Sequence, residues 1–265
     1  LRQTLPRKKA YFPCASREEV ALATLPPDKR KSWKALCKIL GHEAGGDMLA
    51  LNGSFRQFLT RYPECNLLYS KMQYTHILVN QVKGDKYRKS SALEELWKGQ
   101  CSSAYWPDPV YGGLYCNYLR KMAYRSLISA EKVTREKGVF IPSIVTADFD
   151  MDNRIEYLYQ GNDMNAYVHA LGGRLFELDY VPVSWNYLDT MARHRESNDD
   201  AEFDRYSRDA FIDHFFGTDD TLDSFEQGTC RETASFLHVP YHVLKCDREH
   251  SELVLEGLGL VVGRS

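Results

Sequence analysis

The chain has 265 residues, enough to bury the core of one large domain or two modest ones. Its residues are 43% hydrophobic and 26% charged, a composition typical of globular proteins. A formal net charge of −2 gives no overall attraction to nucleic acid or to a membrane surface, so neither is expected as a partner. No apolar run approaches the ~18 residues of a transmembrane helix.

The first half of the chain has the periodicity and stop signals of helices. Ser16 and Glu19 form a capping box for a short helix that ends before two prolines, and Asp28 can cap the next helix, which runs through Leu40. Further helices are predicted at about 55–62, 67–82, 91–97 and 114–136. In the last of these, one face carries Leu119, Met122, Ala123, Leu127 and Ala130.

Beyond residue 138 the composition becomes typical of strands separated by turns. Strands are predicted at about 144–146, 154–160, 166–171, 174–180, 236–246 and 252–256, and another begins near 259. Gly172 and Gly173 fit a two-residue hairpin turn, and residues 193–209 read as an exposed excursion. The fold class is therefore α+β, a helical bundle domain followed by an antiparallel β-sandwich domain. Because the chain ends directly after an apolar run, we expect the sandwich to be truncated.

Residues 100–115, here called the aromatic loop, are the strongest functional candidate. Four aromatic side chains fall within eleven positions, and two prolines and two glycines fix the path of a loop before a helix N-terminus. Tyr and Trp offer flat apolar faces with a polar edge, which suits stacking on sugar rings, and Trp106 is the preferred stacking residue. An aromatic cluster that seals a helix junction explains the same pattern equally well.

Other polar groupings give weaker signals. Residues 148–153 begin like a calcium loop, but Asn153 stands where that loop needs glycine and Tyr159 where it needs glutamate, so a strand-connecting turn is preferred. His169 lies in an apolar pattern and reads as a satisfied core histidine. Seven cysteines without close pairing favour a reducing, cytoplasmic setting. We assign no metal site, no cofactor and no self-contained catalytic group.

Several segments together resemble glycoside hydrolase family 57, of the 4-α-glucanotransferase and α-amylase type. The Tyr62-Pro63-Glu64-x-Asn66 run is one, and the aromatic loop resembles the family's fifth conserved region. The resembling segments are 9–19, 53–66, 99–115, 174–180, 186–190 and 211–215. The resemblance implies three parts: residues 1–27 as the tail of a catalytic barrel that this chain lacks, 28–138 as the helical bundle domain, and 139–265 as the N-terminal part of the β-sandwich domain.

The resemblance also implies retaining chemistry on α-1,4-glucans or maltooligosaccharides, with water or a sugar hydroxyl as acceptor. The glutamate nucleophile and aspartate acid/base belong to the barrel, so no catalytic residue is assigned here, and the barrel of the same parent chain is the expected partner. The implied substrate-binding residues are Gln100, Ser103, Tyr105, Trp106, Asp108, Tyr111, Gly112 and Gly113.

The aromatic loop departs from the family pattern in two places. Ser103 stands where an acidic residue or cysteine is usual, and Trp106-Pro107-Asp108-Pro109 replaces Trp-His-Gly with one residue more. These departures keep a second hypothesis open, in which the protein is a non-catalytic glucan-binding module or an inactive homologue.

Overall fold

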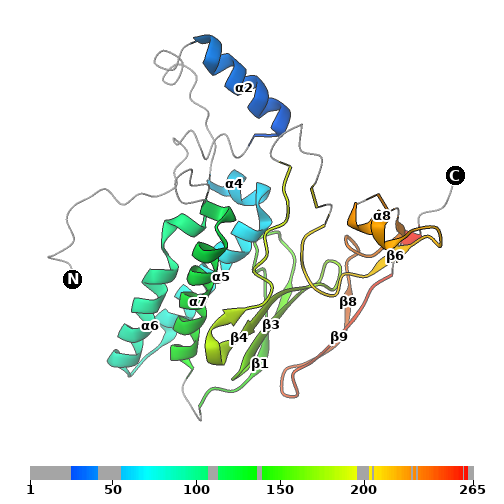
Figure 1. The fold of residues 1–265 in the computed structure, drawn as a ribbon. Helices are drawn as coiled ribbons and strands as arrows, with labels where there is room; N and C mark the ends of the chain where they lie inside the picture. Colours follow the sequence, from blue (N-terminus) through cyan, green and yellow to red (C-terminus); the bar gives the residue numbers. More distant parts are fainter. Residues whose placement is uncertain are drawn as a thin grey trace.

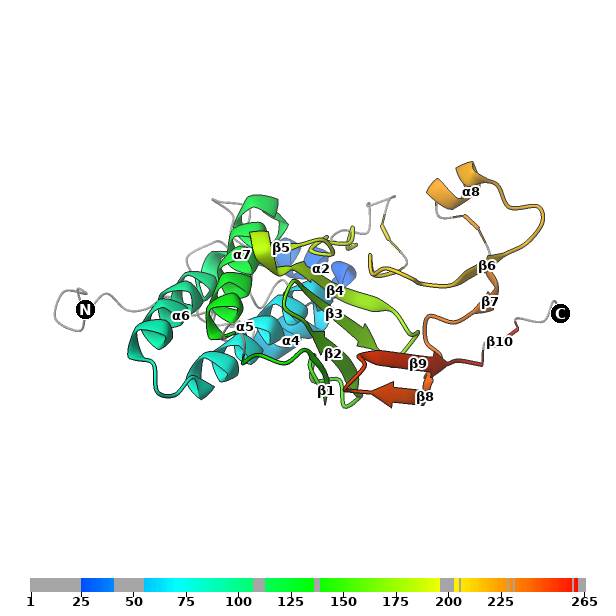
Figure 2. The ribbon, with the colours of Figure 1, turned by 90° about the horizontal axis from the view of Figure 1, so that it is seen from below.

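The computed structural model describes residues 25–40, 55–106, 113–135, 139–195, 203–204, 206–227, 229–230, 232–258 and 260–261. The predicted helix after Ser16 lies outside these ranges. Within them, no helix has the length and apolar character needed to span a lipid bilayer. Helices α5, α6 and α7 lie together at one end and most strands at the other, with the short helix α8 on the strand side, as Figures 1 and 2 show; this confirms the α+β class.

The described helices of the first half agree with the predicted ones in place, though several begin earlier. They are α2 (Pro27–Leu40), α4 (Phe55–Arg61), α5 (Pro63–Gln81), α6 (Lys86–Gly99) and α7 (Asn117–Thr134). Asp28 lies in the first turn of α2 rather than at its cap. Helix α5 begins at Pro63 because the first helical position needs no N–H donor. The Asp85 side chain caps α6 by accepting a hydrogen bond from the Arg88 N–H at 2.9 Å.

Helices α5, α6 and α7 share one apolar core. Gly99 at the end of α6 allows a close approach to α7, because a Cβ there would lie 2.5 Å from Cδ2 of Leu127. Of the predicted apolar face of α7, Met122 is the exception, with 40% of its surface exposed. The buried members of this core are Leu68, Val79, Ala92, Leu96, Ala104, Tyr105, Ala123, Tyr124, Leu127, Ile128 and Ala130.

A five-stranded antiparallel sheet follows the helices. Its strands are β1 (Ser143–Ala147), β2 (Glu156–Gln160), β3 (Met164–His169), β4 (Leu175–Tyr180) and β5 (Trp185–Asn186), paired in chain order. The predicted turn at Gly172 and Gly173 does join two paired strands, and their φ of +78° and +59° favours glycine; the loop is longer than the two residues predicted, because the His169 N–H donates to the Arg174 carbonyl. Leu67 and Tyr74 of α5 pack against the aromatic residues of this sheet, so α5 covers one of its faces.

The remaining strands form two smaller antiparallel sheets. One contains β6 (His214–Phe216), β7 (Glu232–Ser235) and β10 (Leu260–Val261); the other is the hairpin of β8 (His242–Asp247) and β9 (Glu252–Glu256). Helix α8 (Leu222–Glu226) lies between β6 and β7 in the chain. The prediction of a single strand over 236–246 was wrong. A turn at Phe236–Val239, followed by Pro240, separates β7 from β8. The sandwich arrangement of the sheets and the domain boundaries remain predictions.

One fully buried cation joins the helices to the sheet. Lys71 of α5 lies with its Nζ 2.9 Å from Glu131 of α7 and 3.0 and 2.7 Å from Glu177 and Asp179 of β4, and all four side chains are 0% exposed. Burial opposes the charge on Lys71, but Asp179 and Glu131 raise its pKa well above the ordinary value. Lys71 therefore stays charged and is held from three directions.

Removing this cation leaves buried carboxylates without their partner. We expect Lys71→Met to lower the free energy of unfolding by about 3–5 kcal/mol, measured by urea denaturation. Lys98→Met is the matched control, because Lys98 pairs with Glu95 on the exposed surface of α6 and its loss should leave the urea midpoint unchanged. Equal effects of the two substitutions would contradict the role given to Lys71.

Candidate functional site

The aromatic loop begins and ends in short 3-10 turns. The turn η1 (Ser102–Ala104) follows α6, η2 (Gly113–Tyr115) precedes α7, and the Leu114 N–H donates to the Trp106 carbonyl at 3.0 Å, which draws the two ends together. Gly113 is buried and has φ of +50°, so glycine suits this position. Of the predicted site residues, Asp108, Tyr111 and Gly112 lie outside the described ranges.

Two rings expected to be open for stacking are buried. Tyr105 is 5% exposed and its hydroxyl donates to the Gly99 carbonyl at 2.5 Å; Trp106 is 6% exposed and packs in a cluster with the end of α4 and the start of α5. Both rings fill the junction between helices, which favours the alternative of a sealing aromatic cluster over stacking by Trp106; the assignment of the two residues to substrate binding stays a prediction. Gln100 is exposed, and Ser103 is partly exposed.

A cavity of about 310 Å³, here called the junction pocket, lies beside Tyr115, the last residue of the loop. Helix α7 and η2 form one wall, and β5 with the segment after it forms the other. Its lining residues are Tyr115, Asn117, Arg120, Lys121, Trp185, Asn186, Tyr187, Asp189, Thr190 and Met191.

A buried ion pair connects the two walls of the junction pocket. Arg120 donates to Oδ1 of Asp189 through Nε at 2.9 Å and through Nη2 at 2.6 Å, and the side chains are 3% and 1% exposed. Oδ2 of Asp189 makes no hydrogen bond within the described part of the chain. Burial raises the pKa of Asp189, although Arg120 acts against this. This oxygen is itself buried, so the ion pair holds the two walls of the pocket together rather than facing a ligand.

Exposed aromatic rings surround this ion pair. Tyr115, Trp185 and Tyr187 are 48%, 38% and 61% exposed, and Nζ of Lys121 lies 4.7 Å from the centroid of the Trp185 ring. Asn186 lies between Trp185 and Tyr187 in the chain. Its side chain points inward and donates a hydrogen bond to Oδ1 of Asp179 at 2.9 Å. Successive side chains of an extended segment alternate, so Trp185 and Tyr187 share a side. Sequence reasoning missed Trp185, although this Trp-Asn-Tyr alternation carried the signal.

Comparison with known proteins matches both walls of the pocket to one family. The model of the α-amylase/4-α-glucanotransferase middle domain matches residues 53–134, and the model of the C-terminal domain matches 148–200 and 194–265. The chain belongs to the α-amylase/4-α-glucanotransferase family. Tyr115 to Lys121 lie in its middle domain and Trp185 to Met191 in its C-terminal domain, so the junction pocket lies where the two matched domains meet.

Curated relatives carry both activities named in the family description. α-Amylase 1 of Dictyoglomus thermophilum is 29% identical over 74% of this chain and 29% of its own length. The α-amylase of Pyrococcus abyssi is 26% identical over 91% of this chain and 40% of its own, and the 4-α-glucanotransferase of Thermococcus litoralis is 24% identical over 89% and 39%. The chain thus spans well under half the length of these relatives.

A solved structure shows the same fold. The crystal structure of 4-α-glucanotransferase from Thermococcus litoralis superimposes with a TM-score of 0.78 and 24% identity, over 96% of this chain and 39% of that one. The helices and the antiparallel sheet therefore have the arrangement found in the α-amylase/4-α-glucanotransferase family.

A second polar group lies away from the junction pocket, within the matched C-terminal domain. Asp150, Asp152, Glu156 and His169 bring their side chains together, and their ligand atoms all lie within 4.8 Å of one another. The segment at 148–153 does form the strand-connecting turn that we predicted, between β1 and β2. Its approach to Glu156 and His169 was not foreseen.

Replacing the buried Trp106 and the partly exposed Trp185 by alanine should change the free energy of unfolding by different amounts. We expect Trp106→Ala to cost about 3–5 kcal/mol of unfolding free energy, because it empties a filled core position. Trp185→Ala should cost much less, since its ring lies partly in solvent. Chemical denaturation of both variants checks this difference, and equal losses would mean that Trp106 does not fill the helix junction.

Proposed function

We propose that this chain forms the middle and C-terminal parts of an enzyme that acts on α-1,4-glucans, and that the junction pocket binds the glucan. The observation that carries the proposal is the position of the pocket: its two walls come from the two matched domains of the α-amylase/4-α-glucanotransferase family. Gln100, which is exposed, and Ser103, which is partly exposed, remain proposed substrate contacts of the aromatic loop.

The chemistry of the junction pocket suits a sugar. Trp185 and Tyr187 offer ring faces for the apolar side of a pyranose, and their polar edges stay in water. Asn117 and Thr190, which line the pocket and are exposed, can each donate a hydrogen bond to a hydroxyl and accept one from it. A volume of about 310 Å³ lies at the lower end of small-molecule sites and suits a short segment of a glucan chain.

The catalytic carboxylates are placed, as part of the proposal, in a barrel of the same parent protein. Retaining chemistry needs two carboxyl groups about 5–5.5 Å apart on either side of the scissile bond. The Asp189 carboxylate is buried and held by Arg120, so it supports the walls of the pocket and is not assigned to nucleophilic attack. A cytoplasmic location is also proposed, supported by the free thiols of Cys65, Cys101, Cys116, Cys230 and Cys246.

Tryptophan fluorescence tests binding at the junction pocket, with Trp185 as the reporter. Maltoheptaose should quench the emission, and Tyr187→Ala should weaken the binding by about 1 kcal/mol, about fivefold, because one stacking ring is lost while the reporter remains. Tyr118→Ala is the matched control, since Tyr118 is 70% exposed on α7 and does not line the pocket. Equal affinities for the two variants would exclude the pocket as the binding site.

The chain by itself should not turn over glucan. We expect no release of reducing sugar from starch or maltooligosaccharides, because both reacting carboxylates are assigned to the barrel. An active α-amylase in the same assay serves as the positive control. Turnover by this chain, abolished on replacing a described carboxylate, would show that the catalytic pair lies here instead.

A further inference from the structure

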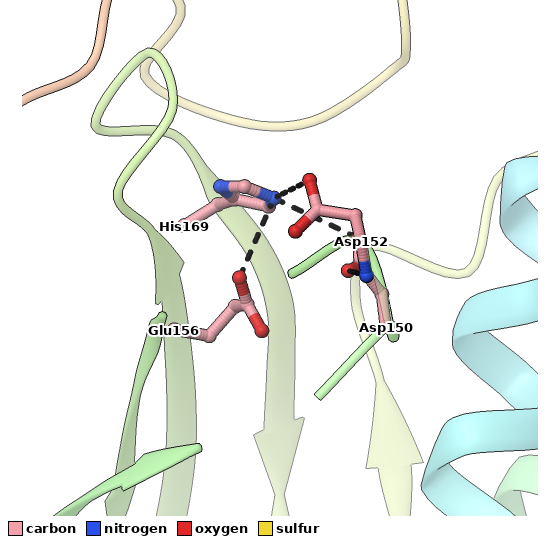
Figure 3. A group of neighbouring side chains, drawn as sticks. All are labelled: Asp150, Asp152, Glu156 and His169. Atoms are coloured by element: carbon pink, nitrogen blue, oxygen red, sulfur yellow. Dashed lines mark hydrogen bonds and ion pairs between the residues drawn. The ribbon is translucent and has the colours of Figure 1, made fainter. Parts of the chain in front are cut away.

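Four side chains from three segments converge near the outer end of the five-stranded sheet (Figure 3). Asp150 and Asp152 come from the turn after β1, Glu156 begins β2 and His169 ends β3. Glu156 and His169 are register partners on adjacent strands, so their side chains share one face of the sheet. This group, here called the His169 cluster, lies outside the proposed glucan site.

Each carboxylate of the His169 cluster uses one oxygen to hold the turn. Oδ1 of Asp150 accepts the Asp152 N–H at 3.2 Å, Oδ1 of Asp152 accepts the Arg154 N–H at 2.8 Å, and Oε2 of Glu156 accepts the Phe149 N–H. These bonds fix the direction of the second oxygens. The turn thus presents three further oxygens toward a common point.

Those three oxygens surround one ring nitrogen. Nε2 of His169 lies 3.6 Å from Oδ2 of Asp150, 3.4 Å from Oδ2 of Asp152 and 3.5 Å from Oε1 of Glu156. Charge-assisted hydrogen bonds are about 2.7–2.9 Å long, so none of these contacts is one. Arg154 also approaches Oδ2 of Asp152, with its Nε at 3.6 Å.

Two of the converging atoms are deeply buried and unpaired. Glu156 is 0% exposed and His169 is 1% exposed, yet neither Oε1 of Glu156 nor Nε2 of His169 has a hydrogen-bond partner among the residues described. Buried polar atoms are rarely left in this state unless another group satisfies them. Both atoms point into the centre of the cluster (Figure 3).

The spacing fits a metal ion at that centre. Ligands about 2.0–2.2 Å from a tetrahedral zinc ion lie about 3.3–3.6 Å from one another, which matches the three measured separations from Nε2. We propose that Asp150, Asp152, Glu156 and His169 bind one divalent metal ion of the zinc type. One nitrogen and three carboxylate oxygens form a mixed ligand set that favours such an ion over calcium, which takes oxygen ligands alone.

The histidine must change its tautomer to bind the ion. Nδ1 of His169 accepts the Leu171 N–H at 2.9 Å, which places the ring proton on Nε2 in the metal-free protein. For Nε2 to hold a metal ion, that proton would pass through solvent to Nδ1, with no net release from the ring. The Nδ1–H and the Leu171 N–H would then be two facing donors, so their hydrogen bond would be lost and the two groups would have to separate.

The ion would fix the β1–β2 turn to the sheet. Nδ2 of Asn66, at the start of α5, already donates to the Asp150 carbonyl at 2.6 Å. A metal held by Asp150 and Asp152 would connect this same turn to β2 and β3. The metal is therefore assigned a structural role, and binding should raise the melting temperature.

Calorimetric titration of the EDTA-treated 265-residue chain with Zn²⁺ tests the proposal. We expect one ion per chain, and at least about tenfold weaker binding for His169→Gln and for Asp152→Asn. Asp152 is 34% exposed on its side chain, so Asp152→Asn should fold even if His169→Gln does not. Asp148→Asn is the matched control, because Asp148 lies in the same turn but outside the cluster. This variant should bind Zn²⁺ as tightly as the unmodified chain.

Two results would overturn the assignment. One is the absence of stoichiometric Zn²⁺ binding, or binding that both His169→Gln and Asp152→Asn leave unchanged. The other is a site that prefers Ca²⁺ and is insensitive to His169→Gln, because the nitrogen ligand would then play no part. Circular dichroism of each variant establishes that it is folded, and maltoheptaose binding provides an independent readout of the glucan proposal.

Discussion

The charge of Lys71 is the constraint on which the arrangement of helices and sheet depends. A buried cation without carboxylate partners costs far more than packing can offset, so α5, α7 and β4 must meet at its Nζ. Burial raises the pKa of Glu177 well above its ordinary value, so this group can keep its proton. Glu131 and Asp179 then face two cations, Lys71 and Arg135, and the buried charges balance.

The same network determines one wall of the junction pocket. Asp179 binds Lys71 through Oδ2 and accepts from Asn186 through Oδ1, so the short strand β5 is held against the buried charges. With Asn186 directed inward, its neighbours Trp185 and Tyr187 must face outward. The Arg120–Asp189 pair then joins the segment after β5 to α7. Two buried ion pairs thus place the aromatic rings of the pocket, which lie on the surface and could not fix their own positions.

Local pattern sufficed for helices α2 to α7, strands β1 to β4 and the Gly172–Gly173 turn, because each depends on periodicity or on a backbone angle that few residues adopt, whereas α8 was not predicted. It failed where the deciding partner is distant in the chain. The sequence around Tyr105 and Trp106 is the same whether their rings face a ligand or a core. Packing against α4, α5 and α7 places both rings in the core. Lys71 lies 108 positions from Asp179, and the His169 cluster requires a strand register that no spacing reveals.

The start of α5 links the two proposed sites while keeping them separable. Within the Tyr62-Pro63-Glu64-x-Asn66 run, Glu64 accepts the Ala192 N–H at 2.9 Å and contacts His194 beyond the junction pocket, and Asn66 donates to the Asp150 carbonyl. Both the Ala192 and Asp150 contacts use backbone atoms of the partner segment. Changing the carboxylate of Asp152 therefore leaves the scaffold of the pocket in place. This run thus supports both sites through the backbone, and each proposal depends on its own side chains.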